Sequence, residues 1–318
     1  MAAIGAGITG YTDGNDNVSS TLTQEVKTYY EKVFLARAEY ELVLKEGAQS
    51  RTHPVNEGRT VNFTRYTPLG IVTSPLGELS NPVTCEITAC TVAMTLSEYG
   101  MTHLHSRLLN LISIDQGMKE KIEVVGQNMG ETLNRLVRAE LANGTAYYGN
   151  DHAIDTLAAG DNLDACNIRM ITQKLELAKA RPYKDGMFIA KTDPVSKYNL
   201  LADNAWLNAK QYSDVSDLYK GEMGELYQVR WLLNKDLSSG IEAASLAASA
   251  IIRYYTYIHG ADSFGVYDLE KDKPKLYIQP QPIDSNSPAG RASIITWAGS
   301  FATKILNPDW VLSCRFTA

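Results

Sequence analysis

Few residues of this chain have types and spacing that could do chemistry. His103 and His105 stand two apart, so on a strand both side chains point to the same side and could share a metal ion. No third ligand follows at a suitable spacing, which argues against a metal site. Asp151 and His152 follow a glycine in a pattern typical of a solvated surface turn.

Other motifs that carry chemistry are incomplete or missing. Asp13, Asp16 and nearby asparagines loosely resemble a calcium loop, but the required spacing and the closing glutamate are missing. The chain contains no serine-hydrolase elbow, zinc-protease motif, phosphate-binding P-loop or strand-linked dinucleotide fingerprint. No Cys-x-x-Cys pair occurs, so we expect reduced, partly buried thiols at Cys85, Cys90, Cys166 and Cys314. The sequence therefore predicts no catalytic residue, no metal and no cofactor.

One glycine-framed stretch needs closer attention. Gly221 and Gly224 enclose Glu222, with the spacing of the loop by which KH domains grip a nucleic-acid backbone. Glu222 and Glu225 would repel phosphate groups, so that function is disfavoured. We interpret the stretch as a turn that leads into a buried strand over 229–233. Arg230 in that strand then needs a carboxylate partner, within its own fold or across an interface.

Composition narrows the class of protein further. The chain has 318 residues and 44% hydrophobic residues, which is enough for two or three compact units. Its net charge is −6 and it has no block of Lys or Arg, which disfavours tight binding to nucleic acid. No apolar run approaches the roughly 20 residues of a membrane span, and residues 1–20 do not read as a secretory signal. We expect a protein of a reducing cytoplasm.

The N-terminal third combines an arm, a helix and a long hairpin. Residues 1–21 are rich in Gly, Ala, Thr and Ser and predict a flexible arm, followed by a helix that ends near Gly47. Residues 51–96 predict a β-hairpin whose Pro/Gly-rich tip has no core of its own. In its second strand, over 84–96, the apolar parity shifts near Ala89–Cys90, which predicts a bulge or a strong twist. Such an extension usually packs on another subunit.

The remaining elements alternate between helices and strands. A capping box at 113–116 opens a long amphipathic helix over 113–143, on the order of 46 Å in length. Helices are predicted over 164–180 and from Asp193-Pro194 onward, with strands at 187–190, 229–233 and 251–258. The Ser/Ala-rich run 238–250 has no clear assignment.

Several segments, taken in order, resemble one known family. They are YYEKV (29–33), GRTVNF (58–63) with RYTPL (65–69), LYKGEMG (218–224) followed by Arg230, HGADSFGV (259–266) and ILNPDW (305–310). In this order they resemble the major capsid proteins of phages of the coliphage N-four type, which have the Hong Kong 97 capsid fold. The resemblance extends over about residues 24–316.

The resemblance implies an α+β fold with named parts. Residues 1–50 would form the N-arm, 51–96 the hairpin called the E-loop, and 97–235 the peripheral domain with a spine helix at 113–143. Residues 236–318 would form the axial domain and a C-terminal return strand. The assembly and family-motif residues are Gly221, Glu222, Gly224, Arg230, Gly260 and Pro308, and the E-loop interface residues are Arg65, Tyr66, Pro68, Leu69 and Pro75.

The same resemblance implies a structural function. The chain would self-assemble, as hexamers and pentamers, into the icosahedral head shell of a tailed double-stranded DNA phage, in the host cytoplasm. Its partners would be other copies of itself, a separate scaffold protein, a portal and decoration proteins, and the shell would enclose DNA loosely. The alternatives are an encapsulin-type bacterial shell, a glycan- or receptor-binding module that uses the aromatic residues, or a cytoplasmic enzyme that uses the histidines above.

Overall fold

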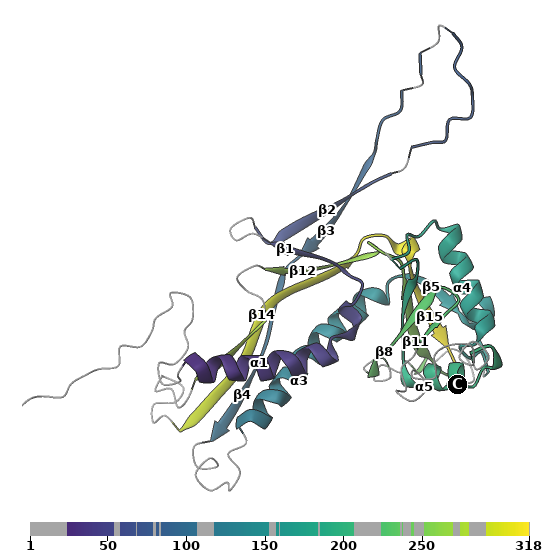
Figure 1. Cartoon of the computed structure of the whole chain (residues 1–318). Coiled ribbons are helices and arrows are strands. Elements are labelled where there is room, and N and C mark those ends of the chain that lie inside the picture. Colours follow the sequence, from purple (N-terminus) through teal and green to yellow (C-terminus); the bar gives the residue numbers. More distant parts are fainter. Residues whose placement is uncertain are drawn as a thin grey trace, which may run out of the picture.

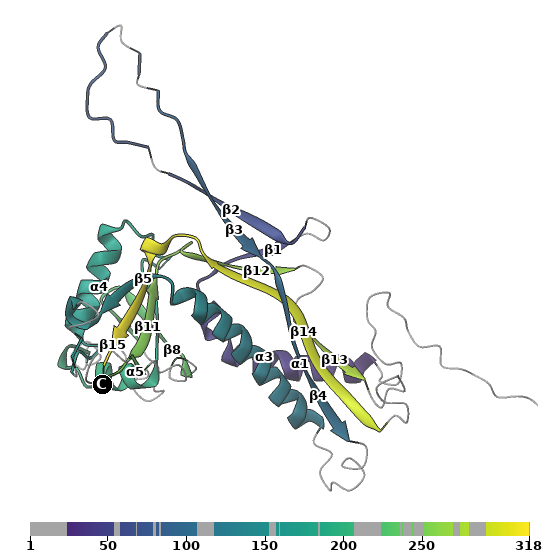
Figure 2. The same ribbon diagram turned by 180° about the vertical axis from the view of Figure 1, so that it is seen from behind.

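The computed structural model describes residues 24–53, 58–67, 69–78, 81–82, 84–106, 118–152, 157–158, 160–183, 185–206, 224–235, 237, 243–244, 251–269, 274–279 and 291–317. Two lobes and one projecting hairpin make up this part of the chain (Figure 1). The view from behind shows the same division, with the hairpin leading away from both lobes (Figure 2).

The first lobe is built on a sheet whose central strand is β14 (Ala292–Ile305). The N-terminal part of β14 runs antiparallel to β4 (Ser97–Ser106) on one side and β13 (Lys275–Gln279) on the other. Its C-terminal part pairs with β12 (Phe264–Leu269), which is in turn parallel to β1 (Gln49–His53). The alternating burial along β14 shows that one face of this sheet is covered.

Two helices provide that cover. α3 (Met118–Leu141) packs on β14, and α1 (Gln24–Glu41) packs on α3. Apolar side chains at helical spacing on α3 are buried against the sheet: Ile122, Val125, Met129, Leu133, Val137 and Leu141. The long helix predicted over 113–143 is therefore confirmed over Met118–Leu141, while the capping box at 113–116 lies outside the described residues.

Two glycines on α3 let α1 approach closely. A Cβ added to Gly126 would lie 2.7 Å from the backbone oxygen of Phe34, and one added to Gly130 would lie 2.6 Å from that of Ala38. Both distances are shorter than real carbon–oxygen contacts. The four-residue spacing puts both glycines on the helix face that α1 covers.

The second lobe contains a mixed six-stranded sheet in the order β5-β15-β11-β6-β8-β7. These strands are β5 (Thr145–Tyr148), β15 (Val311–Phe316), β11 (Tyr254–His259), β6 (Phe188–Thr192), β8 (Val229–Leu233) and β7 (Glu225–Leu226). α4 (Ala165–Leu177) and α5 (Pro194–Leu201) belong to the same lobe. The helix start predicted at Asp193-Pro194 is confirmed, because Asp193 accepts from two backbone N–H groups of α5. Asp164 caps α4 in the same way by accepting from Asn167 N–H.

Short elements complete the description. They are η1 (Val43–Lys45), η2 (Gly149–Asp151), η4 (Pro308–Trp310), β9 (Ala243–Ala244) and β10 (Ile251–Ile252). The strand predicted over 251–258 is divided into β10 and β11 by Arg253. Of the Ser/Ala-rich run, only Ala243–Ala244 is described, and it pairs with β10.

The hairpin consists of β2 (Thr60–Tyr66) and β3 (Ala89–Thr95) in antiparallel register. Phe63 on β2 is buried at its base, in a small core with side chains of the first lobe. The parity shift in the predicted strand 84–96 has a simpler cause than a bulge: strand pairing begins only at Ala89, so Cys85 and Ile87 belong to no strand. Gln49–His53 pairs within the first lobe, so the hairpin begins later than residue 51.

The expected division of the chain at residue 235 does not follow the sheets. β11 precedes β12 in the chain, yet it pairs with β6 and β15 in the second lobe. β12, β13 and β14 lie in the first lobe with β4 and α3. The chain therefore leaves the first lobe, forms most of the second, returns, and leaves again for β15. Hydrogen bonding between distant strands decides this grouping, which no local pattern reports.

Candidate functional site

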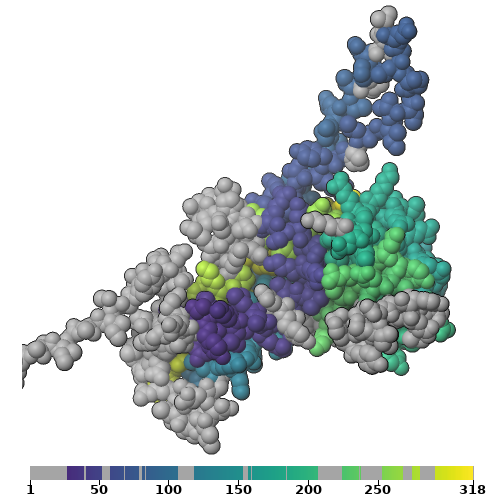
Figure 3. All heavy atoms as spheres, in the orientation of Figure 1, coloured from purple at the N-terminus to yellow at the C-terminus, as the bar shows by residue number. Residues whose placement is uncertain are grey.

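The hairpin projects beyond both lobes and carries exposed apolar side chains (Figure 3). Ile71 is 86% exposed and Val72 is 70% exposed, and Leu69, Leu76 and Ile87 are also exposed. Exposed apolar surface of this kind marks a site of protein–protein interaction. Of the predicted interface residues, Arg65, Tyr66, Leu69 and Pro75 are all exposed on the hairpin, and Pro68 lies outside the described residues.

A second feature is the junction where the chain crosses between the lobes. It crosses at residues 260–263 and again at 306–310, and the two segments are hydrogen-bonded to one another. The N–H groups of Leu306 and Asn307 donate to the oxygen of Ser263 over 2.9 and 3.0 Å, and Gly260 N–H donates to Trp310 O over 3.1 Å. The structure thereby brings the predicted residue Gly260 to the same junction as the segment that contains Pro308.

Gly260 is required here because of a close approach. A Cβ at this position would lie 2.6 Å from the backbone oxygen of Arg181, while the neighbouring Ala261 N–H donates to that same oxygen over 2.7 Å. Pro308 is exposed at the start of η4, and its carbonyl accepts a hydrogen bond from Thr145 Oγ1 over 3.0 Å.

Tyr183 connects three backbone segments at this junction. Its hydroxyl donates to Gly47 O over 2.6 Å and lies 2.9 Å from Nδ1 of His259 and 3.0 Å from Gly260 O. Gly47 has φ of +80°, and a Cβ there would lie 2.6 Å from the Tyr183 oxygen. Burial raises the pKa of Tyr183, and the negative charges of Asp262 and Glu46 add to the effect. The phenol therefore stays neutral and acts as a structural donor.

Two basic side chains are completely buried beside it. Lys191 Nζ donates to Leu44 O over 2.6 Å and lies 4.7 Å from the centre of the Phe264 ring. Burial lowers the pKa of Lys191 well below its ordinary value, and Glu46 opposes this only in part.

His259 packs edge-on against the same ring, with centroids 5.0 Å apart. Burial, followed by the charge of Lys191, lowers the pKa of His259 well below its ordinary value, although the Gly260 carbonyl opposes the shift. Its Nε2 has no hydrogen-bond partner among the described residues.

Arg230 reaches the edge of this junction. Its Nη1 lies 3.5 Å from Glu46 Oε1, and the two side chains are 49% and 43% exposed. Arg230 therefore has a carboxylate partner within its own fold, but the partner is Glu46 on a distant segment and not one of the glutamates near Arg230 in the sequence. The pair lies at the surface and not in an apolar interior. Gly224 O accepts from Trp231 N–H over 3.3 Å, while Gly221 and Glu222 lie outside the described residues.

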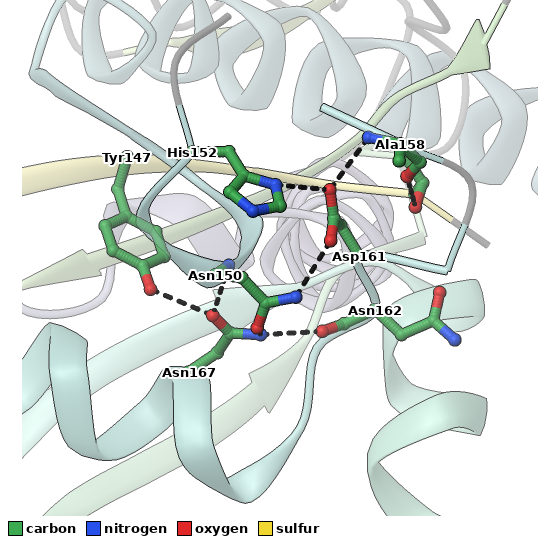
Figure 4. A network of polar contacts seen from close by, with 8 residues as sticks. Tyr147, Asn150, His152, Ala158, Asp161, Asn162 and Asn167 are labelled. Atoms are coloured by element: carbon green, nitrogen blue, oxygen red, sulfur yellow. Dashed lines mark hydrogen bonds and ion pairs between the residues drawn. The ribbon is translucent and has the colours of Figure 1, made fainter. Parts of the chain in front are cut away.

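Asp151 and His152 are exposed at the end of the short turn η2, which confirms the solvated surface turn that the sequence predicts. His152 also belongs to a hydrogen-bonded network in the second lobe (Figure 4), where its Nδ1 lies 3.0 Å from Asp161 Oδ2. Asp161 also accepts from Ala158 N–H and from the Asn150 amide, each over 2.8 Å. Burial alone would raise the pKa of Asp161, but these hydrogen bonds outweigh it and lower the pKa.

The centre of the network is the Asn167 side chain on α4. Its Oδ1 accepts from Tyr147 OH over 2.9 Å and from Asn150 N–H over 2.7 Å, and its amide donates to Asn162 O over 2.9 Å. The network ties β5 to the start of α4. It is a structural cluster, because its polar groups are directed at one another (Figure 4).

The remaining candidates for chemistry do not converge. His103 is exposed on β4, whereas His105 is buried with its ring nitrogens 3.1 and 3.2 Å from Lys121 Nζ. Within the described ranges, no three His, Cys, Asp or Glu side chains are grouped so as to hold a metal ion. The four cysteines are free, with Cys85 and Cys90 exposed on the hairpin and Cys314 buried. No helix in the described part is both long and apolar enough to cross a membrane.

Sequence reasoning missed the junction residues Tyr183, Lys191 and His259. A signal existed for Lys191, which follows the apolar residues Phe188, Ile189 and Ala190 in the fully buried strand β6. The sequence also carried a signal for the close approach of α1, because Gly126 and Gly130 stand four residues apart on the predicted long helix. No local signal pointed to Tyr183, whose partners are 76 or more residues away in the chain.

Comparison with known proteins gives a match in structure alone. No family model matches the chain, and no curated protein matches it in sequence. The capsid of Cyanophage Pam1 superposes with a TM-score of 0.68 at 14% identity, covering 90% of this chain and 93% of that one. The capsid of Ralstonia phage GP4 gives 0.68 at 12% identity, covering 87% and 88%, and that of Cyanophage P-SCSP1u gives 0.63 at 11%, covering 86% and 87%.

At such identities the likeness establishes the fold. The chain has the α+β fold of phage capsid proteins over nearly its whole length. The structures that share this fold are structural capsid proteins and not enzymes.

Proposed function

We propose that this chain is the major capsid protein of a tailed double-stranded DNA phage, of the coliphage N-four type with the Hong Kong 97 capsid fold. One observation carries the proposal: the fold matches a phage capsid chain over 90% of this chain and 93% of the other. A match that complete leaves little of either chain for an additional catalytic domain. The structures compared are phage capsids, which favours a phage head over an encapsulin-type shell.

The parts of the fold then take the names that the resemblance supplies, with revised boundaries. The hairpin of β2 and β3 is the E-loop, and α3 is the spine helix. The first lobe, which contains β4, α3, β12, β13 and β14, is the peripheral domain. The second lobe, which contains β5, α4, β6, α5, β8, β11 and β15, is the axial domain, and β15 is the return strand. The sheet pairings support this grouping, because each lobe has its own sheet. One apolar core lies wholly in the second lobe, whereas the core under α3 also takes in Tyr255 and Tyr257 of β11 and Val311 of β15.

The hairpin is the principal contact with a neighbouring copy. Its exposed apolar side chains are not covered by any other described residue, and burying apolar surface contributes about 25 cal/mol per Å². Copies arranged as hexamers and pentamers would cover it in a closed shell assembled in the host cytoplasm. A separate scaffold protein, a portal and decoration proteins complete the proposed partners, and the acidic chain encloses DNA without gripping it.

Particle size tests this function directly. The purified chain would be measured by light scattering and negative-stain microscopy, with and without co-expressed neighbours from its operon. Closed shells, or free hexamers and pentamers, are the expected result. A compact monomer or dimer under all of these conditions would contradict it.

Removing the hairpin tip tests the proposed contact. Deleting residues 68–82 should leave a folded subunit that forms no closed shell. A milder variant replaces Ile71, Val72 and Leu76 by serine, and its matched control replaces Val124, which is 65% exposed on α3. Normal shells from both hairpin variants would refute the contact.

A further inference from the structure

The outer edge of β4 has no strand partner among the described residues. β4 pairs with β14 through ten consecutive residues on one side, and no other described strand lies on its second side. Seven of its ten residues are exposed, including all of residues 100–104, so solvent reaches this edge. Every second residue of an outer strand directs its N–H and C=O groups away from the sheet, where they can bind another strand.

This edge lacks the features by which proteins prevent such pairing. Those features are a short strand, a lysine or proline, a bulge, or a covering segment. β4 is ten residues long, it contains no Lys or Pro, and its register with β14 is unbroken by a bulge. The other outer strands of the sheet, β13 and β1, have five residues each and carry Lys275 and Arg51. The edge of β4 is therefore the one on this sheet that is open to another chain.

The charges of β4 suit antiparallel pairing with a second copy of the same strand. Glu98 lies near the start of β4, whereas His103 and His105 lie near its end. Antiparallel pairing puts the start of one strand beside the end of the other, which separates the two glutamates. Parallel pairing would place them side by side, where like charges repel. A two-fold axis also closes the pair, so that no further copy adds at this edge.

The side chains of β4 favour one register. Thr102 and Leu104 lie on the sheet face away from α3, because they pair with half-buried residues of β14. With the two-fold axis at Thr102, this residue faces its own copy and the exposed Leu104 faces Gly100, which has no side chain to obstruct it. Thr102 Oγ1 already lies 2.9 Å from Thr296 Oγ1, so the axis joins two such threonine pairs in one row.

We propose that two copies of this chain pair through β4 across a two-fold axis at Thr102, so that the sheets of their first lobes become continuous. Hydrogen bonds between the two backbones supply the affinity, and the cross-strand side chains set the direction and register. The contact is separate from the hairpin. The inference rests on the proposed function for its setting, the shell, but the pairing is measurable without a shell.

Charges at the axis test the pairing in unassembled full-length subunits. Thr102→Lys and Thr102→Glu each place like charges opposite one another, so each should weaken the dimer about tenfold or more in sedimentation equilibrium. An equimolar mixture of the two variants should dimerise again, because the facing charges then have opposite signs. Gln173→Lys and Gln173→Glu, exposed on α4, are the matched controls and should behave as wild type. Single variants that dimerise as wild type does, or a mixture that stays monomeric, would overturn the proposal.

A cross-link tests the same contact in weak dimers and in shells. Opposite residues of an antiparallel pair have Cα atoms about 4.5–5.5 Å apart, which suits a disulfide. Thr102→Cys is made in a chain whose Cys85, Cys90 and Cys166 are replaced by serine, because these thiols are not fully buried. Added diamide accepts the two electrons and two protons released when two thiols join. A covalent dimer is expected from subunits and from shells, and none from Gln173→Cys in the same background.

The outcomes separate this inference from the proposed function. A cross-linked dimer from a chain that forms no shell would support the pairing and contradict the capsid function. Shells without a cross-link through residue 102 would overturn the pairing and leave the capsid function standing. A cross-link from residue 102 to a different protein of the particle, in place of the dimer, would also overturn the pairing. Subunits that form neither shells nor cross-linked dimers would contradict both.

Discussion

Lowering the pH below 6.5 should destabilise the lobe junction through His259. This imidazole is fully buried, its Nε2 has no partner among the described residues, and Lys191 adds to the cost of protonating it. In the unfolded chain a histidine titrates near 6.5, whereas burial holds the folded pKa of His259 well below that. Between the two values the unfolded chain binds one more proton, so the free energy of unfolding falls as the pH falls.

The change in the free energy of unfolding can be calculated from the uptake of a single proton by the unfolded chain. Within that window, each pH unit lowers the free energy of unfolding by about 1.4 kcal/mol. Lowering the pH from 6.5 to 5.0 therefore lowers it by up to about 2 kcal/mol. Lys191 has the same sign, because burial also lowers its pKa, but its window begins at the ordinary lysine value, far above that of histidine. The difference between wild type and a variant at residue 259 isolates the histidine.

The assay is urea unfolding of unassembled subunits between pH 8 and pH 5. His259→Asn keeps an amide near the Tyr183 hydroxyl but does not titrate, so its stability should depend less steeply on pH below 6.5 than that of wild type. His103→Asn, on the exposed side of β4, is the matched control and should follow wild type. Parallel pH profiles for wild type and His259→Asn would refute the reasoning.

Three further predictions concern packing and charge. Phe63→Ala should lower stability by about 3–5 kcal/mol and loosen the hairpin base, visible as faster amide exchange over β2 and β3 than in wild type. Gly130→Leu should lower the free energy of unfolding by about 1–3 kcal/mol, because α1 must move off α3, while Val124→Leu on the exposed face of α3 should change the melting temperature little. Arg230→Ala removes an exposed ion pair with Glu46 and should cost about 1 kcal/mol or less, so a large loss in thermal melting would contradict the surface geometry.

The sequence by itself determined the elements whose signals are local. The apolar stripe of α3, the Asp193-Pro194 cap of α5 and the proline- and glycine-broken hairpin all depend on residues close in the chain, and the structure confirms them. The resemblance to capsid proteins likewise came from short ordered motifs. Its coarse implication, the capsid fold, agrees with the structural comparisons.

Only the tertiary structure decided how those elements are divided and joined. The strands β11 and β12 are separated by four residues, yet they lie in different lobes because each pairs with strands far away in the chain. The junction of Tyr183, Lys191 and His259 has the same origin. Its members come from distant segments, and burial, pairing and a shared surface arise only when long-range packing brings those segments together.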